Sequence, residues 1–500
     1  MSSTTSALRS VRFGPLPTQG ILFGLAMSNL VTLAIAILIL FAALMRFGVP
    51  GAAVSAIVWL PLMVVGVLHI HRVPLPVYLF QWGVFMVRHL SGGTSYRFRP
   101  EAPRVEGSLH LPGRRSALQV WEGPTSGAAV VFDPFERTVS ITAEIDVHGF
   151  LLLDEDEQAQ VVSSWSRALA SFTQRDGIAR VVMQERTAPA SLDPAERSFA
   201  AAIARPVAQD EQTVVITSYE AVLHQLRDQA VSHQNYLTIA ISLKSRGAQL
   251  KSLGGGEAAA CAVAELELSA AADAVEKSGF RVRRWLTPRQ WAGLGRLAFD
   301  PDFAAEVAQR TGAGEGVDIA AIGPMALDEP LDKPAIVRTD SAVHTTMWIH
   351  EWPRTDTAPG FMQPVVFAQR ADMAQAVSHI FSIVCEPVKT RAALREIERQ
   401  KKTWMTNASL RQKRGQLVSE LDHFEFQAIR EREQEVVAGH GEFRFAGYLT
   451  VSATDEQALN GAVAGIRNGL AQAALEPQVL YFQQAEALMM NALPTGGGLK

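Results

Sequence analysis

The feature that most constrains the fold is a long stretch without charge near the N-terminus. No Asp, Glu, Lys or Arg occurs between Arg12 and Arg46, and residues 21–45 are almost wholly apolar. A bilayer core about 30 Å thick is crossed by about 20 helical residues. A second apolar run, 49–69, is also long enough to cross, and the linking sequence RFGVPG contains helix-breaking glycines and a proline. The pattern predicts a transmembrane hairpin over residues 21–71.

These apolar runs have two other interpretations. A signal peptide has a shorter apolar region, and here a second run follows at once, so this interpretation is disfavoured. A hydrophobic helical hairpin buried in the core of a soluble protein stays open as an alternative. The low share of charged residues, 19% against about 25% in average soluble domains, favours a chain that lies partly in lipid.

The basic residues near the two spans predict their orientation. Arg9 and Arg12 precede the first span, only Arg46 lies in the turn, and a larger group follows the second span. That group is Arg72, Arg88, Arg97 and Arg99. Because Lys and Arg are enriched on the cytoplasmic side, we expect both termini in the cytoplasm, with residues 1–20 as a cytoplasmic tail. The predicted location is the cell (inner) membrane, crossed twice.

Residues 74–104 are predicted to form an interfacial helix followed by a linker. The segment PLPVYLFQWGVFMVRHL (74–90) is apolar with aromatic and basic residues at its edges, and 91–104 is rich in Gly, Pro and Arg. We expect Arg72, Trp82 and Arg88 to contact lipid headgroups. A headgroup contact is also favoured for the two histidines of HIHR (69–72). The alternative is that 74–90 is the first buried helix of the soluble part.

The remainder has the patterns of an α+β protein. Strand, helix and strand patterns follow one another over 138–187, 236–286 and 443–482. Such units assemble into ferredoxin-like βαβ folds. We expect a first cytoplasmic α/β region at 105–330 and a second at 331–500, with a net charge of −4 for the whole chain. A globally basic nucleic-acid binder is therefore disfavoured.

Residues 388–437 are predicted to form a long helical arm. The stretch 389–414 carries nine basic and two acidic residues, and 420–435 is rich in acid. On a helix, Arg391, Arg395, Arg399 and Lys402 share one face, with Lys389 nearby. The arm can be a solvated helical hairpin whose opposite charges pair with each other. It can also present a basic face to a partner protein or to anionic lipid, and these five residues are the candidates for that contact.

The sequence contains no recognisable catalytic constellation. No GxxxxGK[ST] loop, HExxH motif or GxSxG motif occurs, and the two cysteines, Cys261 and Cys385, lie too far apart for a CxxC motif. The four acids at 154–157 favour a helix N-terminus. His440 looks like part of a helix stop rather than a catalytic base. We therefore expect no enzymatic activity and no catalytic, cofactor-binding or metal-binding residues.

Several segments resemble known secretion proteins. The chain is similar over nearly its whole length to actinobacterial membrane proteins that occur with conjugation-type (type IV) secretion genes. Besides the N-terminal hairpin, the resemblance rests on HGFLLLDEDEQAQVVSSWSRALASF (148–172), VVMQERTAPA (181–190), LTPRQWAGLGRLAFDP (286–301), WIHEWPR (348–354), EVVAGHGEFRFAGYLTVSA (435–453) and MMNALPTGGGL (489–499). The last two also resemble the N-terminal domain of VirB-type secretion ATPases, without the motor.

The resemblance implies a structural subunit rather than an enzyme. We expect an inner-membrane component of a type IV-like secretion or conjugation machine, which docks a separate ATPase and other membrane subunits in a hetero-oligomer. A weaker resemblance to EccE, which also has two N-terminal spans before a large soluble part, makes a type VII secretion core subunit the first alternative. A membrane-bound transferase is the second. Direct nucleic-acid binding is not expected.

Overall fold

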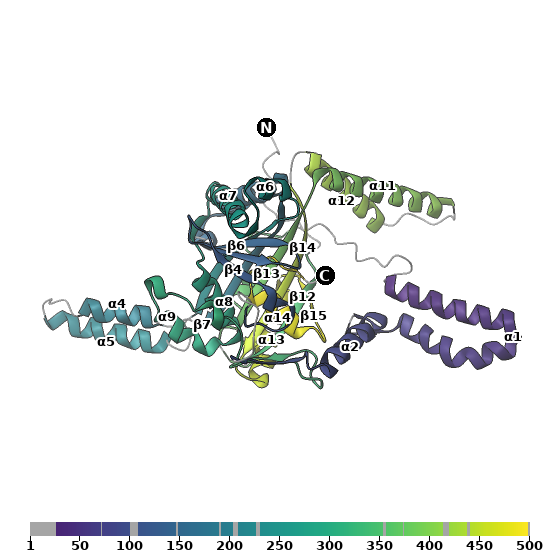
Figure 1. Ribbon diagram of the computed structural model, residues 1–500, viewed down its shortest axis with the longest axis horizontal. Coiled ribbons are helices and arrows are strands. Elements are labelled where there is room, and N and C mark those ends of the chain that lie inside the picture. The colour runs from purple at the N-terminus through teal and green to yellow at the C-terminus, as the bar shows by residue number, and fades with distance from the viewer. Residues whose placement is uncertain are drawn as a thin grey trace.

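The computed structural model describes most of the chain beyond the N-terminal segment (Figure 1). The described residues are 27–71, 73–100, 109–146, 149–189, 192–203, 209–226, 231–353, 357–373, 375–413, 420–437 and 441–498. The predicted tail at 1–20 and the first residues of the predicted first span, 21–26, lie outside them. The protein is a mixture of helices and strands, as the sequence predicts.

The apolar N-terminal region forms α1 (Met27–Val67). Among the described helices, α1 alone is long and apolar enough to cross a membrane, and only 6% of its most apolar window is buried. Gly48 interrupts it with non-helical angles (φ 63°, ψ −159°). Asn29 Nδ2, near its start, lies 3.5 Å from His69 Nε2, just beyond its end, so the two ends of α1 meet. The exposed surface of α1 contradicts the alternative of a helical hairpin buried in the core of a soluble protein.

A short antiparallel strand pair and a second helix follow α1. β1 (His69–Ile70) pairs with β2 (Val73–Pro74), and α2 (Leu75–Leu90) begins directly after β2. Pro76 lies in the first turn of α2, where its missing N–H costs nothing.

One sheet of 13 strands organises the remaining described residues. Its order is β3-β10-β11-β12-β14-β13-β7-β8-β6-β5-β4, with β15 paired to β12 and β9 paired to β6. The strands are β3 (Ser95–Arg97), β4 (Gln119–Glu122), β5 (Ala129–Asp133), β6 (Thr138–Asp146), β7 (Ile178–Pro189), β8 (Val231–Ser242), β9 (Arg281–Trp285), β10 (Ala326–Asp328), β11 (Val337–Arg338), β12 (Val343–Glu351), β13 (Ser378–Val388), β14 (Glu442–Ala453) and β15 (Glu476–Val479).

The two halves of this sheet repeat one antiparallel order. The first half reads β9-β6-β8-β7 and the second reads β15-β12-β14-β13. In the first half, α3 (Glu155–Gln174) joins β6 to β7, and α7 (Gly256–Glu276) joins β8 to β9. In the second half, the short α10 (Gln363–Val366) lies between β12 and β13, and α13 (Glu456–Gln472) joins β14 to β15. β7 and β13 pair from Val181↔Cys385 to Thr187↔His379 and so join the halves.

The two faces of the sheet pack against different helices. Val181 and Ile383 face the layer that contains Phe172 of α3 and residues of α7. Their neighbours Val182 and Val384 point to the opposite face and contact Met490, because successive strand residues alternate between faces. Met490 belongs to α14 (Gln484–Ala492), which covers the second face together with α8 (Pro288–Phe299).

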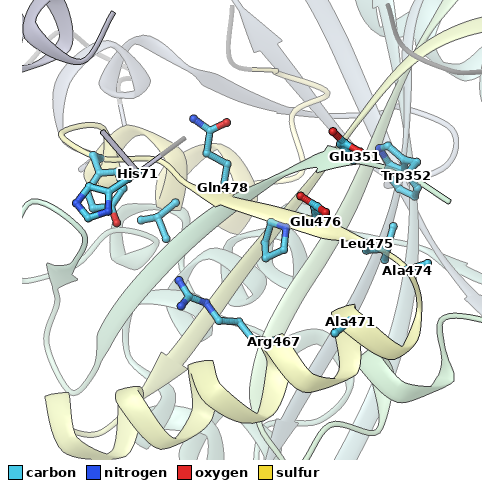
Figure 2. A pocket seen from close by; sticks show the side chains of 12 residues that line it. His71, Glu351, Trp352, Arg467, Ala471, Ala474, Leu475, Glu476 and Gln478 are labelled. Atoms are coloured by element: carbon cyan, nitrogen blue, oxygen red, sulfur yellow. The ribbon is translucent and has the colours of Figure 1, made fainter. Parts of the chain in front are cut away.

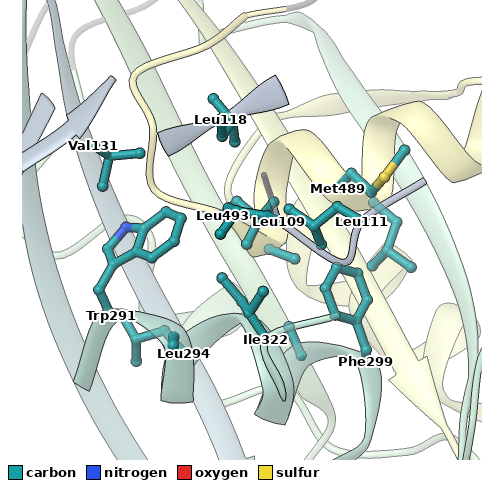
Figure 3. Packing of buried hydrophobic residues seen from close by; sticks show 14 of the residues in the cluster. Leu109, Leu111, Leu118, Val131, Trp291, Leu294, Phe299, Ile322, Met489 and Leu493 are labelled. Atoms are coloured by element: carbon teal, nitrogen blue, oxygen red, sulfur yellow. The ribbon is translucent and has the colours of Figure 1, made fainter. Parts of the chain in front are cut away.

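The core on this second face combines residues from near the start and the end of the sheet-forming part of the chain, residues 95–498 (Figure 3). Trp291 and Phe299 of α8 pack with Leu109, Leu111 and Leu493. The chain after α14 is buried through residue 496. The Leu-Pro segment predicted from the VirB-type resemblance is therefore part of the core, and Pro494 accepts a 3.4 Å hydrogen bond from Trp291 Nε1.

Two helical arms occupy equivalent places in the two halves. α4 (Asp193–Ile203) and α5 (Gln209–Leu226) lie between β7 and β8, whereas α11 (Thr390–Lys413) and α12 (Glu420–Val437) lie between β13 and β14. Figure 1 shows α11 and α12 projecting on the same side of the sheet as α1, while α4 and α5 project on the other side. The remaining short helices are α6 (Gly247–Ser252) and α9 (Ala304–Ala308).

The sheet also runs through two segments that the sequence divides differently. The predicted linker 91–104 contains β3, whose Arg97 pairs with Ala326 of β10. The predicted boundary between residues 330 and 331 falls between β10 and β11, which pair at Asp328↔Arg338. The prediction of a simple linker is wrong for 95–97, because the strand partner that orders them is more than 200 residues away.

Candidate membrane-proximal site

α2 has two faces of opposite environment. Phe85 is fully buried, and its ring centroid lies 5.4 Å from that of Phe482. The other face carries exposed apolar side chains: Leu79, Phe80, Val84, Val87 and Leu90. Phe80 is 71% exposed and Leu90 is 81% exposed. A helix on the surface of a soluble protein turns its apolar stripe toward the core, so this outward apolar face indicates a surface that meets something other than water.

Arg88 lies on the inner side of α2. Its Nη2 donates to the Phe482 carbonyl at 2.6 Å and lies 3.2 Å from Glu329 Oε2. The Glu329 side chain is fully buried, and its Oε1 accepts a 2.7 Å hydrogen bond from the backbone N–H of Gln484 at the start of α14. Burial raises the pKa of Glu329 despite the opposing effect of Arg88. The ion pair therefore connects α2 to α14.

These contacts involve one of the three residues predicted to contact headgroups. Arg88, whose side chain is 29% exposed, binds a buried carboxylate and a backbone carbonyl through Nη2. Trp82 is 46% exposed and stays a candidate for the interface. Arg72 lies outside the described residues. α2 has a feature of each alternative for residues 74–90. Its inner face packs against the rest of the protein, and its outer face is apolar and exposed.

His71, in the turn between β1 and β2, lies against the residues that follow β15. His71 has a left-handed backbone (φ 50°), and its ring stacks on Tyr481 with centroids 4.7 Å apart. Tyr78 of α2 lies 6.2 Å from Tyr481 and 5.2 Å from Phe482 by ring centroids. Aromatic contacts at these distances stabilise the docking of α2 against the residues that follow β15.

A groove of about 960 Å³ opens beside this aromatic cluster. It is lined by His71, Glu351, Trp352, Arg467, Ala471, Ala474, Leu475, Glu476, Pro477, Gln478, Val479 and Tyr481. The lining therefore comes from the turn after α1, the end of β12, the last turn of α13, and β15 with its flanks (Figure 2). Arg467 is exposed and forms no ion pair with any described residue.

The basic face of α11 is a second surface of interest. Arg391, Arg395 and Arg399 are exposed and form no hydrogen bond or ion pair with the side chains that the structure describes. Lys389 lies 3.0 Å from Asp176, with both side chains at least 80% exposed, and Lys402 lies 3.2 Å from Glu398 one turn earlier. Exposed pairs of this kind contribute little to stability.

The opposite face of α11 packs on α12. Ala393 and Ile397 are fully buried with Val436, and the rings of Trp404 and Phe426 stack at 4.3 Å. The predicted pairing of charges between the two helices occurs at Lys401 and Glu433, and the side chains of residues 420–425 lie outside the description. The helical hairpin is thus stabilised through its apolar face, while Arg391, Arg395 and Arg399 point away from it.

A partly buried polar cluster lies where β7, β8 and β13 meet. Glu185 Oε1 accepts from Thr187 at 2.5 Å and lies 3.2 Å from His233 Nδ1, and Glu185 Oε2 lies 3.3 Å from His379 Nε2. Burial alone would raise the pKa of Glu185, but contacts with His233 and His379 outweigh burial and lower this pKa to about 2. His379 is only 1% exposed, so a substrate has no direct access to it.

Other residues singled out by the sequence have structural positions. Asp154 and Glu157 form a capping box at the start of α3. His440 lies outside the described residues. Across the ranges given above, no group of three or more His, Cys, Asp or Glu side chains is placed to hold a metal ion. Cys261 and Cys385 are both buried and unbonded to each other.

Sequence reasoning missed Glu329, Arg467 and Tyr481. Glu329 and Tyr481 acquire their roles from α2, which is hundreds of residues away in the chain, so no local pattern marks them. The left-handed positions carry no signal in the sequence either, because an Ala and a Phe stand at 474 and 482, where the backbone conformation favours glycine.

The comparisons with known proteins leave the family open. No protein-family model matches this chain, and no curated protein is found to be related to it. The features of this chain that bear on its function are the apolar surface of α1 and α2, the groove beside them and the basic face of α11.

Proposed function

We propose that this chain is a non-enzymatic, membrane-anchored subunit of a secretion or conjugation machine. The observation that carries the proposal is the apolar surface of α1, continued on the outer face of α2. Exposed apolar surface of this size on a soluble protein marks contact with a membrane or a partner. A helix with the length and composition of α1 finds its most favourable environment in lipid.

In this proposal α1 forms two spans joined at Gly48. The contact of Asn29 with His69 supports a return of the chain to the side on which it entered. Gly66 supports close packing of the two legs, because a Cβ there would lie 2.8 Å from Leu33 Cγ, and small residues let membrane helices approach closely. Each leg has about 20 residues and would be about 30 Å long. Both ends of α1 would then be cytoplasmic.

We further propose that each half of the sheet is a ferredoxin-like unit with a helical arm inserted between its second and third strands. The repeated order β9-β6-β8-β7 and β15-β12-β14-β13 supports this assignment. Projecting arms on a rigid sheet suit a protein that connects other subunits. We propose a separate secretion ATPase as the partner in trans, docked by the soluble part, with other membrane subunits in the same complex.

The basic face of α11 is proposed to contact an anionic surface of that complex. Arg391, Arg395 and Arg399 repel one another by a few tenths of a kcal/mol per pair. α11 projects on the same side as α1 (Figure 1). A basic surface of this kind binds an acidic partner protein or anionic lipid headgroups.

Topology is tested by thiol labelling of intact cells. Val49→Cys in the proposed external turn should react with an impermeant maleimide. Ser252→Cys on α6 should react only after the cells are opened. The native cysteines are no substitute for this control, because Cys261 and Cys385 are 3% and 5% exposed and would stay unlabelled on either side. Labelling of Ser252→Cys in intact cells would overturn the proposed orientation.

Docking is tested by purifying the full chain from membranes and identifying the proteins that accompany it. A secretion ATPase should copurify with the wild type. It should be lost from the triple variant Arg391→Glu, Arg395→Glu, Arg399→Glu if this face binds the partner. The melting temperature of the variant should stay unchanged, since these side chains make no internal contact. A variant that loses stability, and regains it when Glu431, Glu433 and Glu435 are changed to Lys, would refute docking through this face.

A further inference from the structure

A row of polar side chains crosses the seam between the two halves of the sheet, where β7 pairs with β13. Thr187 of β7 is paired with His379 of β13 on one side and with His233 of β8 on the other. Glu185 lies two residues before Thr187 and therefore on the same face of β7. The row thus brings one carboxylate, one hydroxyl and two imidazoles together from both halves.

The surroundings of His379 assign a proton to each of its ring nitrogens. Nδ1 lies 2.8 Å from the carbonyl oxygen of Val377, which can only accept a hydrogen bond, so Nδ1 carries a proton. Nε2 lies 3.3 Å from Glu185 Oε2, and neither atom forms a hydrogen bond with any other described residue. An ionised carboxylate also can only accept. A neutral His379 would therefore direct the lone pair of Nε2 at a carboxylate oxygen, whereas an imidazolium forms an ion pair with it.

The other contacts of Glu185 keep this carboxylate ionised. Its Oε1 accepts a hydrogen bond from Thr187 Oγ1 at 2.5 Å and lies 3.2 Å from His233 Nδ1. Because the single hydroxyl proton of Thr187 is directed at Glu185, Thr187 Oγ1 accepts from His233 Nδ1, which is 2.8 Å away. Burial opposes the ionisation of Glu185, but these contacts and His379 outweigh burial and lower its pKa to about 2.

The pair lies in an environment that strengthens its electrostatics. The side chain of His379 is fully buried, and that of Glu185 is 13% exposed. In such a site a charge interaction is strong, and an unpaired charge is costly. His233 is the charged group that faces the pair from β8, and Phe367 covers the His233 ring at 5.1 Å between centroids. On β14, the residue paired with His379 is the apolar Val451.

We propose that His379 and Glu185 form a proton-dependent contact that fastens the two halves of the sheet to each other. With an imidazolium at His379, the ion pair holds β13 to β7 at one end of their pairing. Loss of that proton leaves two acceptors facing each other in a buried site, and this end of the seam separates. The proton therefore controls how firmly the second half, which carries α11 and α12, is held to the first. The contact acts independently of the membrane anchoring proposed above.

A second buried histidine is a matched control. His344 of β12 is fully buried, and its Nε2 and Nδ1 lie 2.7 Å from Thr339 Oγ1 and 2.8 Å from Ser452 Oγ. A hydroxyl can donate as well as accept, so a neutral imidazole satisfies both contacts. Burial lowers the pKa of His344 to about 3. The two histidines share their burial and differ in the carboxylate that only His379 meets.

The charge state is measured by NMR of the full chain, labelled with ¹⁵N-histidine and purified in mild detergent. Signals are assigned through their loss in His379→Gln and His344→Gln. At about pH 7.5, above the ordinary histidine pKa of about 6.5, both nitrogens of His379 should be protonated, and His344 should be neutral. Glu185→Gln should convert His379 to the neutral form, since the Gln amide can donate to Nε2. A neutral His379 in the wild type would overturn the proposal, whether or not the variants fold.

The effect on the seam is measured by amide hydrogen exchange, corrected for the intrinsic dependence of exchange on pH. Between about pH 6 and about pH 9, the protection of residues 185–187 and 379–381 should fall about tenfold, the effect of an interaction of about 1.4 kcal/mol. The pairing of β12 with β14 around His344 should keep its protection. Glu185→Gln should abolish the fall at the seam. Protection of the seam that does not change with pH, or an equal fall in Glu185→Gln, would refute the proton-dependent contact.

Discussion

Replacement of Arg186 should destabilise the packing of α8 and α14 against the sheet. Arg186 lies on β7 and is buried, with 7% of its surface exposed. Its Nε donates to Gln184 Oε1 at 2.7 Å, Nη1 donates to the Leu294 carbonyl at 2.8 Å, and Nη2 donates to the Ala492 carbonyl at 2.6 Å. Burial lowers its pKa to about 10, so the guanidinium stays charged at neutral pH. It connects β7 to α8 and to the last residue of α14.

The expected cost of Arg186→Met follows from the acceptors that it leaves behind. Gln184 Oε1 and the Ala492 carbonyl lose their donor, whereas the Leu294 carbonyl lies inside α8 and keeps its helix hydrogen bond. A buried acceptor without a partner costs about 1–3 kcal/mol. Part of this loss is offset, because folding of the variant does not transfer a guanidinium from water into the protein interior. We expect a net destabilisation of about 3 kcal/mol. Arg186→Lys should lose about half of that, since an ammonium group can reach fewer of the three acceptors.

The measurement is urea unfolding of the full chain in mild detergent, together with amide hydrogen exchange. Exchange should increase in α14 and in the buried tail around Pro494, while α3 and α7 on the other face should stay protected. Arg395→Met, which removes an exposed arginine of α11, is the matched control and should change the free energy of unfolding by less than about 0.5 kcal/mol. Equal stability of Arg186→Met and the wild type, with unchanged exchange in α14, would refute this reasoning.

Further expectations concern an ion pair, a helix end and a titrating carboxylate. Arg88→Met should cost about 2 kcal/mol in urea unfolding, because it leaves Glu329 buried without its cation, and adding Glu329→Gln should restore part of the loss; an additive double variant would contradict the pairing. Ala474→Gly should stabilise the protein by about 0.5–1 kcal/mol, since glycine adopts the left-handed conformation without strain; a lower melting temperature would argue against that conformation. The pKa of Glu185, about 2 when folded against 4.5 for the free side chain, is depressed. Its stabilisation is therefore present above about pH 4.5 and lost as the pH falls toward 2. The difference in unfolding free energy between wild type and Glu185→Gln, at most about 3 kcal/mol, should shrink over that range, and a constant difference would refute the assignment.

The parts of the fold that the sequence predicts well are those with local causes. The apolar run gives α1, the acidic cluster at 154–157 gives the capping box of α3, and alternating patterns give β6, β8 and β14. Within the predicted arm, residues 390–413 and 420–437 are helical, and the segment 388–437 contains no proline and a single glycine. Each of these elements is marked by a pattern within its own segment, although β6, β8 and β14 pair with strands that are distant in sequence.

The fourth strand–helix–strand unit escaped the sequence analysis. Between β12 and β13 the connecting helix is reduced to α10, four residues long. No helical periodicity can be recognised in so short a segment. The repeat of the two halves becomes visible only from the strand order.

Three arginines show why the candidate site could be predicted only in part. Arg88, Arg186 and Arg395 have the same side chain, and each lies on a regular helix or strand. Arg88 meets a buried carboxylate 241 residues away, Arg186 meets carbonyls 108 and 306 residues away, and Arg395 meets no described partner. The environment of a charge is set by these distant segments, and pattern along the chain carries no information about them. The exposed basic face of α11 was predictable because helical spacing alone places its members together. The inward direction of Arg88 was not, because a helix beside a membrane offers an arginine both phosphate and protein partners, and the choice depends on where Glu329 lies.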